Sequence, residues 1–415
     1  MLPVFESIKY QIFKNRLSEQ SLLWWLAAGI SITIVWLPIL NAILCVAFIV
    51  LRAYQVRFRF RIHRISMVVL FASFYVITAF SVLYSDNQPE AIRILQLKLP
   101  LFIFPFVFAS GVDWDKKMIR LLLLLFSWSV ALFCFLVIGN AIVKATTSGS
   151  IQALFGYSIL PLKYVYASIA SLFCVFGSAI HLNEIAEKRK LTIVHLIPLL
   201  LFWTTLILIS NRMGIFLCVI ITLFFLLRLV QSAAIKSLTV VFIFFVLIGL
   251  YSWNQTFQQK IKALVQVDAQ QTIQLDEESS LGRTWDGLHL RLAIWDCATD
   301  VIKRHPLAGV GVGDAQQTLQ EAYENRKFYF ASRHNTYNAH NQFLEQWLMT
   351  GIVGCLLFIL ALAIPLILSL KNDKLLYSLF LIIFICFCLT ESVLEVTKGV
   401  VWFSFFNSIF AFQKN

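Results

Sequence analysis

Residues 332–354, SRHNTYNAHNQFLEQWLMTGIVG, join a polar, histidine-rich loop directly to an apolar helix. The apolar residues of this helix recur at the spacing of one helical face: Phe343, Leu344, Trp347 and Leu348. The pattern predicts that His340 lies in the first turn of this helix, at a membrane surface. A helix N-terminus carries partial positive charge, so it disfavours protonation of an imidazole placed against it. His340 is therefore either a proton-accepting base or a residue that only caps or solvates the helix end.

The composition of the whole chain is that of a membrane protein. Of its 415 residues, 59% are hydrophobic and 13% are charged, so polar side chains are too few to cover a soluble protein of this size. The net charge of +12 raises the question of nucleic acid binding, but Lys and Arg cluster in short loops between apolar runs, which indicates membrane topology. We therefore expect an all-α polytopic membrane protein that contacts membrane lipids and no nucleic acid.

The apolar runs predict about twelve transmembrane helices. A helix needs about 20 apolar residues to cross a bilayer, or somewhat fewer with tilt and interfacial anchors. Pro38 and Asn41 predict a tight reversal between the first two helices. The predicted spans are residues 22–36, 39–53, 65–84, 97–110, 118–139, 162–182, 191–209, 213–230, 237–253, 343–369, 375–390 and 395–412.

The distribution of Lys and Arg predicts the orientation. With the N-terminus inside, the inside segments hold 19 of these residues. The short outside loops hold 6, namely Arg93, Lys98, Lys144, Lys163, Arg212 and Lys398. Because cytoplasmic loops are the basic ones, both termini are predicted to be cytoplasmic. The predicted organisation is a cytoplasmic interfacial segment at 1–20, nine transmembrane helices at 21–253, one large loop domain outside at 254–342, and three helices with the C-terminus at 343–415.

The long loop is expected to be partly helical. Residues 309–313, GVGVG, follow its first helix and precede a second short helix at about 314–330. A phosphate-binding loop is rejected for GVGVG, because no Lys-Ser/Thr follows it and no strand precedes it; its glycines allow a sharp turn instead. The first helix, 288–304, ends before Pro306, and its predicted face consists of Leu288, Leu292, Trp295, Thr299 and Ile302.

Two arginines and one histidine form the principal candidate site. Arg212 stands between two apolar runs at their outer end, where it either snorkels to the interface or binds a lipid-linked phosphate through its planar donors. Arg291 begins the loop helix near the face of Trp295, and by itself it reads as a surface arginine. With His340 they would make a coherent set: two groups for a diphosphate and one for a hydroxyl.

Other polar residues are secondary candidates. His334 is a second histidine for the same anionic substrate, and Lys163 is an additional phosphate contact. Glu391 and Glu395 stand at the outer end of the last helix pair, where carboxylates more often pair with an arginine than act as bases. Neither an H-E-x-x-H motif nor a zinc-type cysteine spacing is present, so we expect no metal site and no cofactor.

Three groups of residues, with the long loop and the helix count, resemble the O-antigen ligase and polymerase superfamily of bacterial envelope assembly. The resemblance extends over most of residues 60–412, including the ending TESVLEVTKGVVWFSFFNSIF. Its motifs are Ser210, Arg212 and Gly214; Arg291, Trp295, Pro306, Gly309, Gly311 and Gly313; and His340 and Asn341 followed by Gly351 and Gly354.

The resemblance implies a metal-independent glycosyltransferase of GT-C-like architecture at the periplasmic face of the bacterial inner membrane. Its donor would be a glycan on undecaprenyl diphosphate, held by Arg212 and Arg291. His340 would act as general base or position the acceptor hydroxyl, although His334 competes for the role of base. The first expectation is an O-antigen ligase that uses lipid A core as acceptor. An O-antigen polymerase or a protein O-oligosaccharyltransferase is a near alternative, and a lipid-linked glycan transporter or flippase is a distant one.

Overall fold

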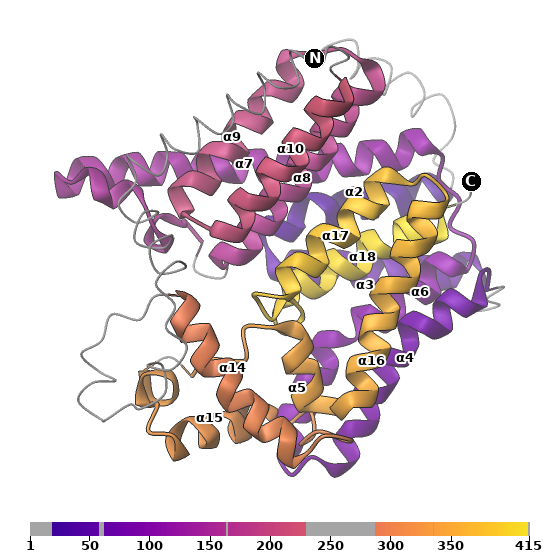
Figure 1. Cartoon of the computed structure of the whole chain (residues 1–415). Coiled ribbons are helices and arrows are strands. Elements are labelled where there is room, and N and C mark those ends of the chain that lie inside the picture. The colour runs from indigo at the N-terminus through magenta and orange to yellow at the C-terminus, as the bar shows by residue number, and fades with distance from the viewer. Residues whose placement is uncertain (1–18, 58–61, 163–164, 230–286, 335, 414–415) are drawn as a thin grey trace.

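The computed structural model describes residues 19–57, 62–162, 165–229, 287–334 and 336–413. Throughout these ranges the regular elements are helices, without a strand (Figure 1). The first part of the chain forms α2 (Glu19–Trp36), α3 (Pro38–Gln55), α4 (Ile65–Ser81), η1 (Val82–Tyr84), α5 (Gln88–Lys98), α6 (Pro100–Ala109), α7 (Lys116–Ser148), η2 (Ile151–Leu154) and η3 (Tyr157–Ile159). It continues with α8 (Ala167–Lys188), α9 (Ile193–Ile209), α10 (Arg212–Leu229), α14 (Gly287–Arg304), α15 (Ala315–Asn325), η4 (Phe330–His334), α16 (Gln342–Lys371), α17 (Leu375–Cys388), η5 (Val393–Glu395) and α18 (Thr397–Phe412).

The chain is a multi-pass membrane protein. Within the described ranges, 7 helical segments are long and apolar enough to cross a membrane, and three shorter apolar helices accompany them. Eleven of the twelve predicted spans coincide with helices, and the twelfth, 237–253, lies outside the described residues. The predicted span 97–110 belongs to a longer segment, Gln88–Ala109, in which α5 and α6 follow one another.

The predicted reversal after the first helix is confirmed. α2 ends at Trp36 and α3 begins at Pro38, which occupies a first-turn position where its missing N–H costs nothing. The Asn41 side chain donates to the carbonyl of Ile30 (3.0 Å) and to the hydroxyl of Thr33 (3.0 Å). These bonds fasten the second helix back onto the first, so the sequence 22–51 forms two helices and not one.

The C-terminal helix α18 lies at the centre of the bundle. Every side chain from Lys398 to Phe412 is buried. A helix that is apolar on all sides belongs inside a bundle, and α18 packs against α2, α6 and α17. Lys398, in the first turn of α18, donates to the carbonyls of Ile34 and Val35, so its ammonium caps the end of α2.

The loop domain docks on α16 through a break in that helix. Gly351 has φ +67, so α16 is kinked there and not continuous as predicted. The backbone groups of α16 freed by the kink pair with the loop: Val310 N–H donates to Leu348 O (2.8 Å) and Ile352 N–H donates to Pro306 O (3.0 Å). Figure 1 shows α14 and α15 at one end of the molecule, beside α5 and the start of α16.

The predicted glycine-rich turn at 309–313 is confirmed. Its glycines are needed both for positive φ angles and for close packing. Gly309 and Gly311 have φ of +72 and +98, a conformation that side chains disfavour. A β-carbon on Gly309 would lie 2.4 Å from Leu348 O, and one on Gly311 would lie 2.6 Å from the Ser85 hydroxyl. The glycines therefore let the loop backbone approach α16 and Ser85, the residue that follows η1.

Two expectations about the loop helices need correction. The second helix, α15, ends at Asn325 and is followed by the π-helix η4, so it does not reach residue 330. The buried stripe of α14 is also displaced from the predicted face, whose members other than Ile302 are only half-buried. α14 packs against α15 and α16 through this stripe, which consists of Ala293, Ile294, Cys297, Ala298, Val301 and Ile302.

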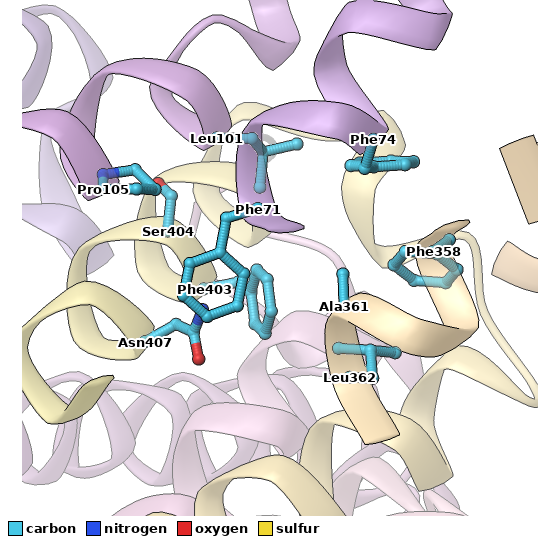
Figure 2. Close-up of a pocket in the computed structure, with 10 residues that line it drawn as sticks. All are labelled: Phe71, Phe74, Leu101, Pro105, Phe358, Ala361, Leu362, Phe403, Ser404 and Asn407. Carbon is cyan, nitrogen blue, oxygen red and sulfur yellow. The ribbon is translucent and has the colours of Figure 1, made fainter. Parts of the chain in front are cut away.

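A mostly apolar pocket opens between α4, α6, α16 and α18 (Figure 2). Phe71, Phe74 and Phe358 contribute its aromatic wall. Of its two polar lining residues, Asn407 is already engaged, because its side-chain oxygen accepts from the Tyr377 hydroxyl at 2.9 Å. None of the residues predicted for the active site lines this pocket, so the pocket is separate from the candidate active site.

Candidate active site

Arg291 is held at the end of α17 by bonds to three different groups. Its Nε donates to Thr390 O (2.9 Å), one terminal nitrogen donates to Gly287 O (3.2 Å), and the other meets a carboxylate oxygen of Glu391 (2.5 Å). The sequence predicted Arg291 near the face of Trp295, and these side chains lie one helical turn apart on α14. The arginine therefore joins the loop domain to the segment between α17 and α18.

His340 lies in the turn before α16 and not in its first helical turn, which corrects the prediction. The helix is capped by Asn341, whose side-chain oxygen accepts from the N–H groups of Phe343 (2.9 Å) and Leu344 (3.2 Å). The capping role considered for His340 is thus filled by its neighbour. His340 itself has φ +45, and its N–H donates to the Asn338 side chain at 3.1 Å.

The preceding residue fixes this turn from both sides. The carbonyl of Ala339 accepts from the indole N–H of Trp295 (3.0 Å), and its N–H donates to the Glu345 carboxylate (2.9 Å). A positive φ is energetically unfavourable for a residue other than glycine. The two hydrogen bonds of Ala339 hold the backbone on either side and so keep His340 in this conformation. The imidazole is thereby aimed by the loop domain and by α16 together.

Glu391 connects His340 with Arg291. One carboxylate oxygen lies 3.2 Å from Nδ1 of His340, and the other lies 2.5 Å from Arg291. Burial raises the pKa of Glu391, but the hydrogen bond from His340 and the charge of Arg291 outweigh it, so the pKa lies below the ordinary value. An ionised carboxylate only accepts hydrogen bonds, so in the neutral imidazole the proton sits on Nδ1 and Nε2 is the basic nitrogen.

The side chains of Glu391, Arg291 and His340 are partly buried but still accessible to a ligand. The exposed fractions of Glu391, Arg291 and His340 are 18%, 23% and 26%. Partial burial strengthens electrostatic contacts, while the remaining exposure leaves room for a ligand to reach them.

Arg212 is the first residue of α10, immediately after a sharp turn. Ser210 has φ +56, and the Asn211 side chain accepts from the N–H of Gly214 at 2.8 Å. A β-carbon on Gly214 would lie 2.7 Å from the Leu206 side chain, so a larger residue there would force that side chain of α9 to shift. The Ser-x-Arg-x-Gly pattern thus builds a compact turn with the arginine at the start of α10.

Arg212 and Arg291 converge beside Gly287, the first residue of α14. A β-carbon placed there would lie 3.2 Å from a terminal nitrogen of Arg212 and 3.5 Å from one of Arg291. The two guanidinium groups come from helices that are far apart in the sequence. Their common location creates a cationic position next to Glu391 and His340, and two forked donors suit the oxygens of a phosphate.

Tyrosines at positions 157 and 337 border the same place, and sequence reasoning did not single them out. Desolvation raises the pKa of Tyr157, the charges of Arg291 and Arg212 oppose the rise, and that of Glu391 adds to it. Because Tyr157 is 61% exposed, water screens these influences, but all three charges act on one phenol. Tyr337 lies 5.4 Å from His340, measured between ring centroids.

A buried ion pair between Lys98 and Glu395 supports the segment that carries Glu391, and the sequence did not predict it. Lys98 has no exposed surface, and its ammonium lies 2.7 Å from Glu395. Glu395 also accepts from the side chain of Gln342 (3.0 Å), whose oxygen accepts from the N–H of Leu394 (2.6 Å). The segment that carries Glu391 is therefore bonded to both α5 and the start of α16.

Of the other candidates, one has a different partner and two lie wholly or partly outside the described residues. Glu395 pairs with Lys98 and not with an arginine. The backbone of His334 ends the π-helix η4, and its side chain lies outside the described part. Lys163 also lies outside the described residues. Over the ranges that the structure describes, no three His, Cys, Asp or Glu side chains are grouped so that they could hold a metal ion.

Comparison with known proteins adds the family. The model of a family described as O-Antigen ligase matches residues 197–359, which run from α9 to the middle of α16 and include Arg212, Arg291 and His340. The matched region is narrower than the resemblance in the sequence, and Glu391 lies beyond it. No curated protein matches the chain. Residues 197–359 of this chain are thus similar to the O-antigen ligase domain family, whose members are glycosyltransferases that use lipid-linked donors.

Proposed function

We propose that this protein is an O-antigen ligase, which transfers a glycan from undecaprenyl diphosphate to a sugar hydroxyl of lipid A core. The observation that carries the proposal is that the Glu391 carboxylate contacts both His340 and Arg291. Arg212 and Arg291 also lie together beside Gly287. A base and two cations in one place match the needs of glycosyl transfer from a diphosphate. The family supports the donor class.

In this mechanism Arg212 and Arg291 bind the diphosphate of the donor. Nε2 of His340 accepts the proton of the acceptor hydroxyl as that oxygen attacks the anomeric carbon. The bond from the anomeric carbon to the phosphate oxygen breaks, and its electron pair leaves with undecaprenyl diphosphate. Positioned cations stabilise the charge that develops on this leaving group, so positioning and electrostatics supply much of the rate without a metal.

Glu391 acts through His340 in this scheme. Its carboxylate holds the Nδ1 proton and keeps Nε2 directed at the acceptor, and it stabilises the imidazolium that forms. Asn341 keeps the position by capping α16. Lys163 stays a predicted phosphate contact.

The charge pattern supports a site at the periplasmic face of the inner membrane. The loops predicted inside carry 19 Lys and Arg against 6 in the short loops on the other side. Both termini would then be cytoplasmic and residues 254–342 periplasmic. A glycan on undecaprenyl diphosphate would reach Arg212 at the outer end of its helix without leaving the bilayer.

The assay supplies purified protein with undecaprenyl-diphosphate glycan and either lipid A core or a second donor molecule. A ligase forms glycan-bearing lipid A core, whereas a polymerase forms a longer lipid-linked glycan. His340→Ala should abolish the product, and Arg212→Ala should chiefly weaken donor use. Full turnover by both variants would refute the mechanism. EDTA should leave the rate unchanged, and a loss that Mg²⁺ restores would refute metal independence.

A further inference from the structure

The short turn that carries Tyr157 is anchored on both sides. The N–H of Gly156 donates to Leu208 O (2.9 Å) at the end of α9. Asn140 of α7 donates to Ile159 O (2.7 Å), and Lys144 donates to Ser158 O. The turn is therefore fixed to α7 and to the helix end that leads into Arg212.

Tyr157 is the exposed residue of this anchored turn. Ile159 is fully buried, whereas Tyr157 is 61% exposed. An exposed aromatic ring on a rigid backbone is poorly explained by packing, because nothing covers most of its surface. It suits a residue that contacts a ligand, since little conformational freedom is lost when the ligand binds.

Tyr337 is a second tyrosine whose backbone is anchored, and it lies next to His340. The carbonyl of Tyr337 accepts from the side chains of Gln316 (3.2 Å) and Gln320 (2.9 Å) on α15. Its ring lies beside the imidazole of His340. The ring of Tyr337 is therefore next to the proposed base, while the turn that carries Tyr157 is fixed to the helix end that leads into Arg212.

The donors of Arg291 are largely occupied within the protein. Its nitrogens already bond to Thr390 O, Gly287 O and the Glu391 carboxylate. A diphosphate offers several acceptor oxygens and gains charge when the glycan leaves. The site therefore calls for a further donor close to Arg212, and a neutral phenol supplies one without adding charge.

We propose that the hydroxyl of Tyr157 donates a hydrogen bond to the diphosphate of the lipid-linked donor, beside Arg212 and Arg291. This inference rests on the proposed function, because it assumes that a diphosphate occupies the cationic position. Tyr157 then contributes to donor binding and to stabilisation of the leaving group, and not to recognition of the acceptor.

The test measures binding of undecaprenyl diphosphate to the purified full-length protein, followed by steady-state kinetics. Tyr157→Phe should weaken binding about tenfold, the value of one hydrogen bond to a charged group. The KM for the donor should rise while the KM for the acceptor stays constant. Tyr166→Phe is the matched control, because Tyr166 is similarly exposed (58%) but directly precedes α8 and does not lie on the anchored turn; it should bind as wild type does.

Three outcomes separate this inference from the function on which it rests. If Arg212→Ala loses binding and Tyr157→Phe binds within about twofold of wild type, the inference alone is overturned. If Arg212→Ala also binds normally, the proposed donor site itself fails. If Tyr157→Phe binds normally and Tyr157→Ala does not, the ring acts by packing and the hydroxyl has no role, which overturns the inference as well.

Discussion

The carboxylate of Glu391 binds the guanidinium of Arg291 at 2.5 Å, although 100 positions separate the two residues in the chain. Its second oxygen lies 3.2 Å from His340. One side chain thus controls the orientation of the proposed base and of one proposed diphosphate ligand. The two roles are linked through it, and a change at Glu391 should affect both.

Glu391→Gln should lower kcat by about 10²-fold or more, a range typical of positioned acid–base groups. The amide keeps the shape of the carboxylate but loses its charge, and it can present N–H to Nδ1, which favours the tautomer with the proton on Nε2. Initial rates with undecaprenyl-diphosphate glycan measure the effect. Glu391→Asp, which retains the charge, is the control and should keep more activity than the amide. Equal activity of Glu391→Gln and wild type would exclude the positioning role.

The pKa of Glu391 lies below the ordinary glutamate value of 4.5 because His340 and Arg291 favour the ionised form despite burial. Its contribution to stability is therefore fully present above about pH 4.5 and is lost as the pH falls through the lower folded-state pKa. The gap in thermal unfolding midpoint between wild type and Glu391→Gln should be constant from neutral pH to about pH 5 and shrink at lower pH. A gap that closes already between pH 7 and pH 5 would contradict the depressed pKa.

The parts of the fold that sequence predicted well are those with local causes. Apolar runs mark the helices, and Pro38 marks the reversal between α2 and α3 because proline suits a first helical turn. The error at His340 is also local: the capping side chain proved to be Asn341, so the helix begins later than the apolar pattern suggested. Boundaries depend on which of two adjacent polar residues accepts the first N–H groups, and composition does not decide that.

The parts that sequence missed depend on pairs of distant residues. Lys98 was counted among the charges of a short outside loop, but it is buried against Glu395, almost 300 positions later. No local pattern distinguishes a solvated lysine from one with a buried partner. Tyr157 was missed for the same reason, since its proximity to Arg212 follows from the bond between Gly156 and Leu208. The partners of the candidate carboxylates likewise required the fold.

Lys98→Met should destabilise the protein by about 3–5 kcal/mol, because it leaves Glu395 buried without its counter-charge. Replacing both residues, as Lys98→Met with Glu395→Gln, should recover much of this loss, since no uncompensated charge remains. Thermal unfolding in detergent, compared among wild type, the single variant and the double variant, measures it. If the single variant unfolds with wild type, the ion pair contributes nothing and the bonds of Gln342 alone hold the segment.

Gly351→Ala should detach the loop domain from α16. A β-carbon at this position would lie 1.9 Å from Leu307 O, and φ +67 is unfavourable for alanine, so either the kink or the loop must move. If α16 straightens, the carbonyl of Leu348 returns to its own helix and the N–H of Val310 loses its partner. The turn holding His340 would then shift with the loop, because Trp295 of α14 bonds to Ala339. Protease cleavage within the loop domain should accelerate and activity should fall, whereas Gly139→Ala, at a site with open space around the added carbon, should change neither. Wild-type protection and activity in Gly351→Ala would show that the kink is not what docks the loop.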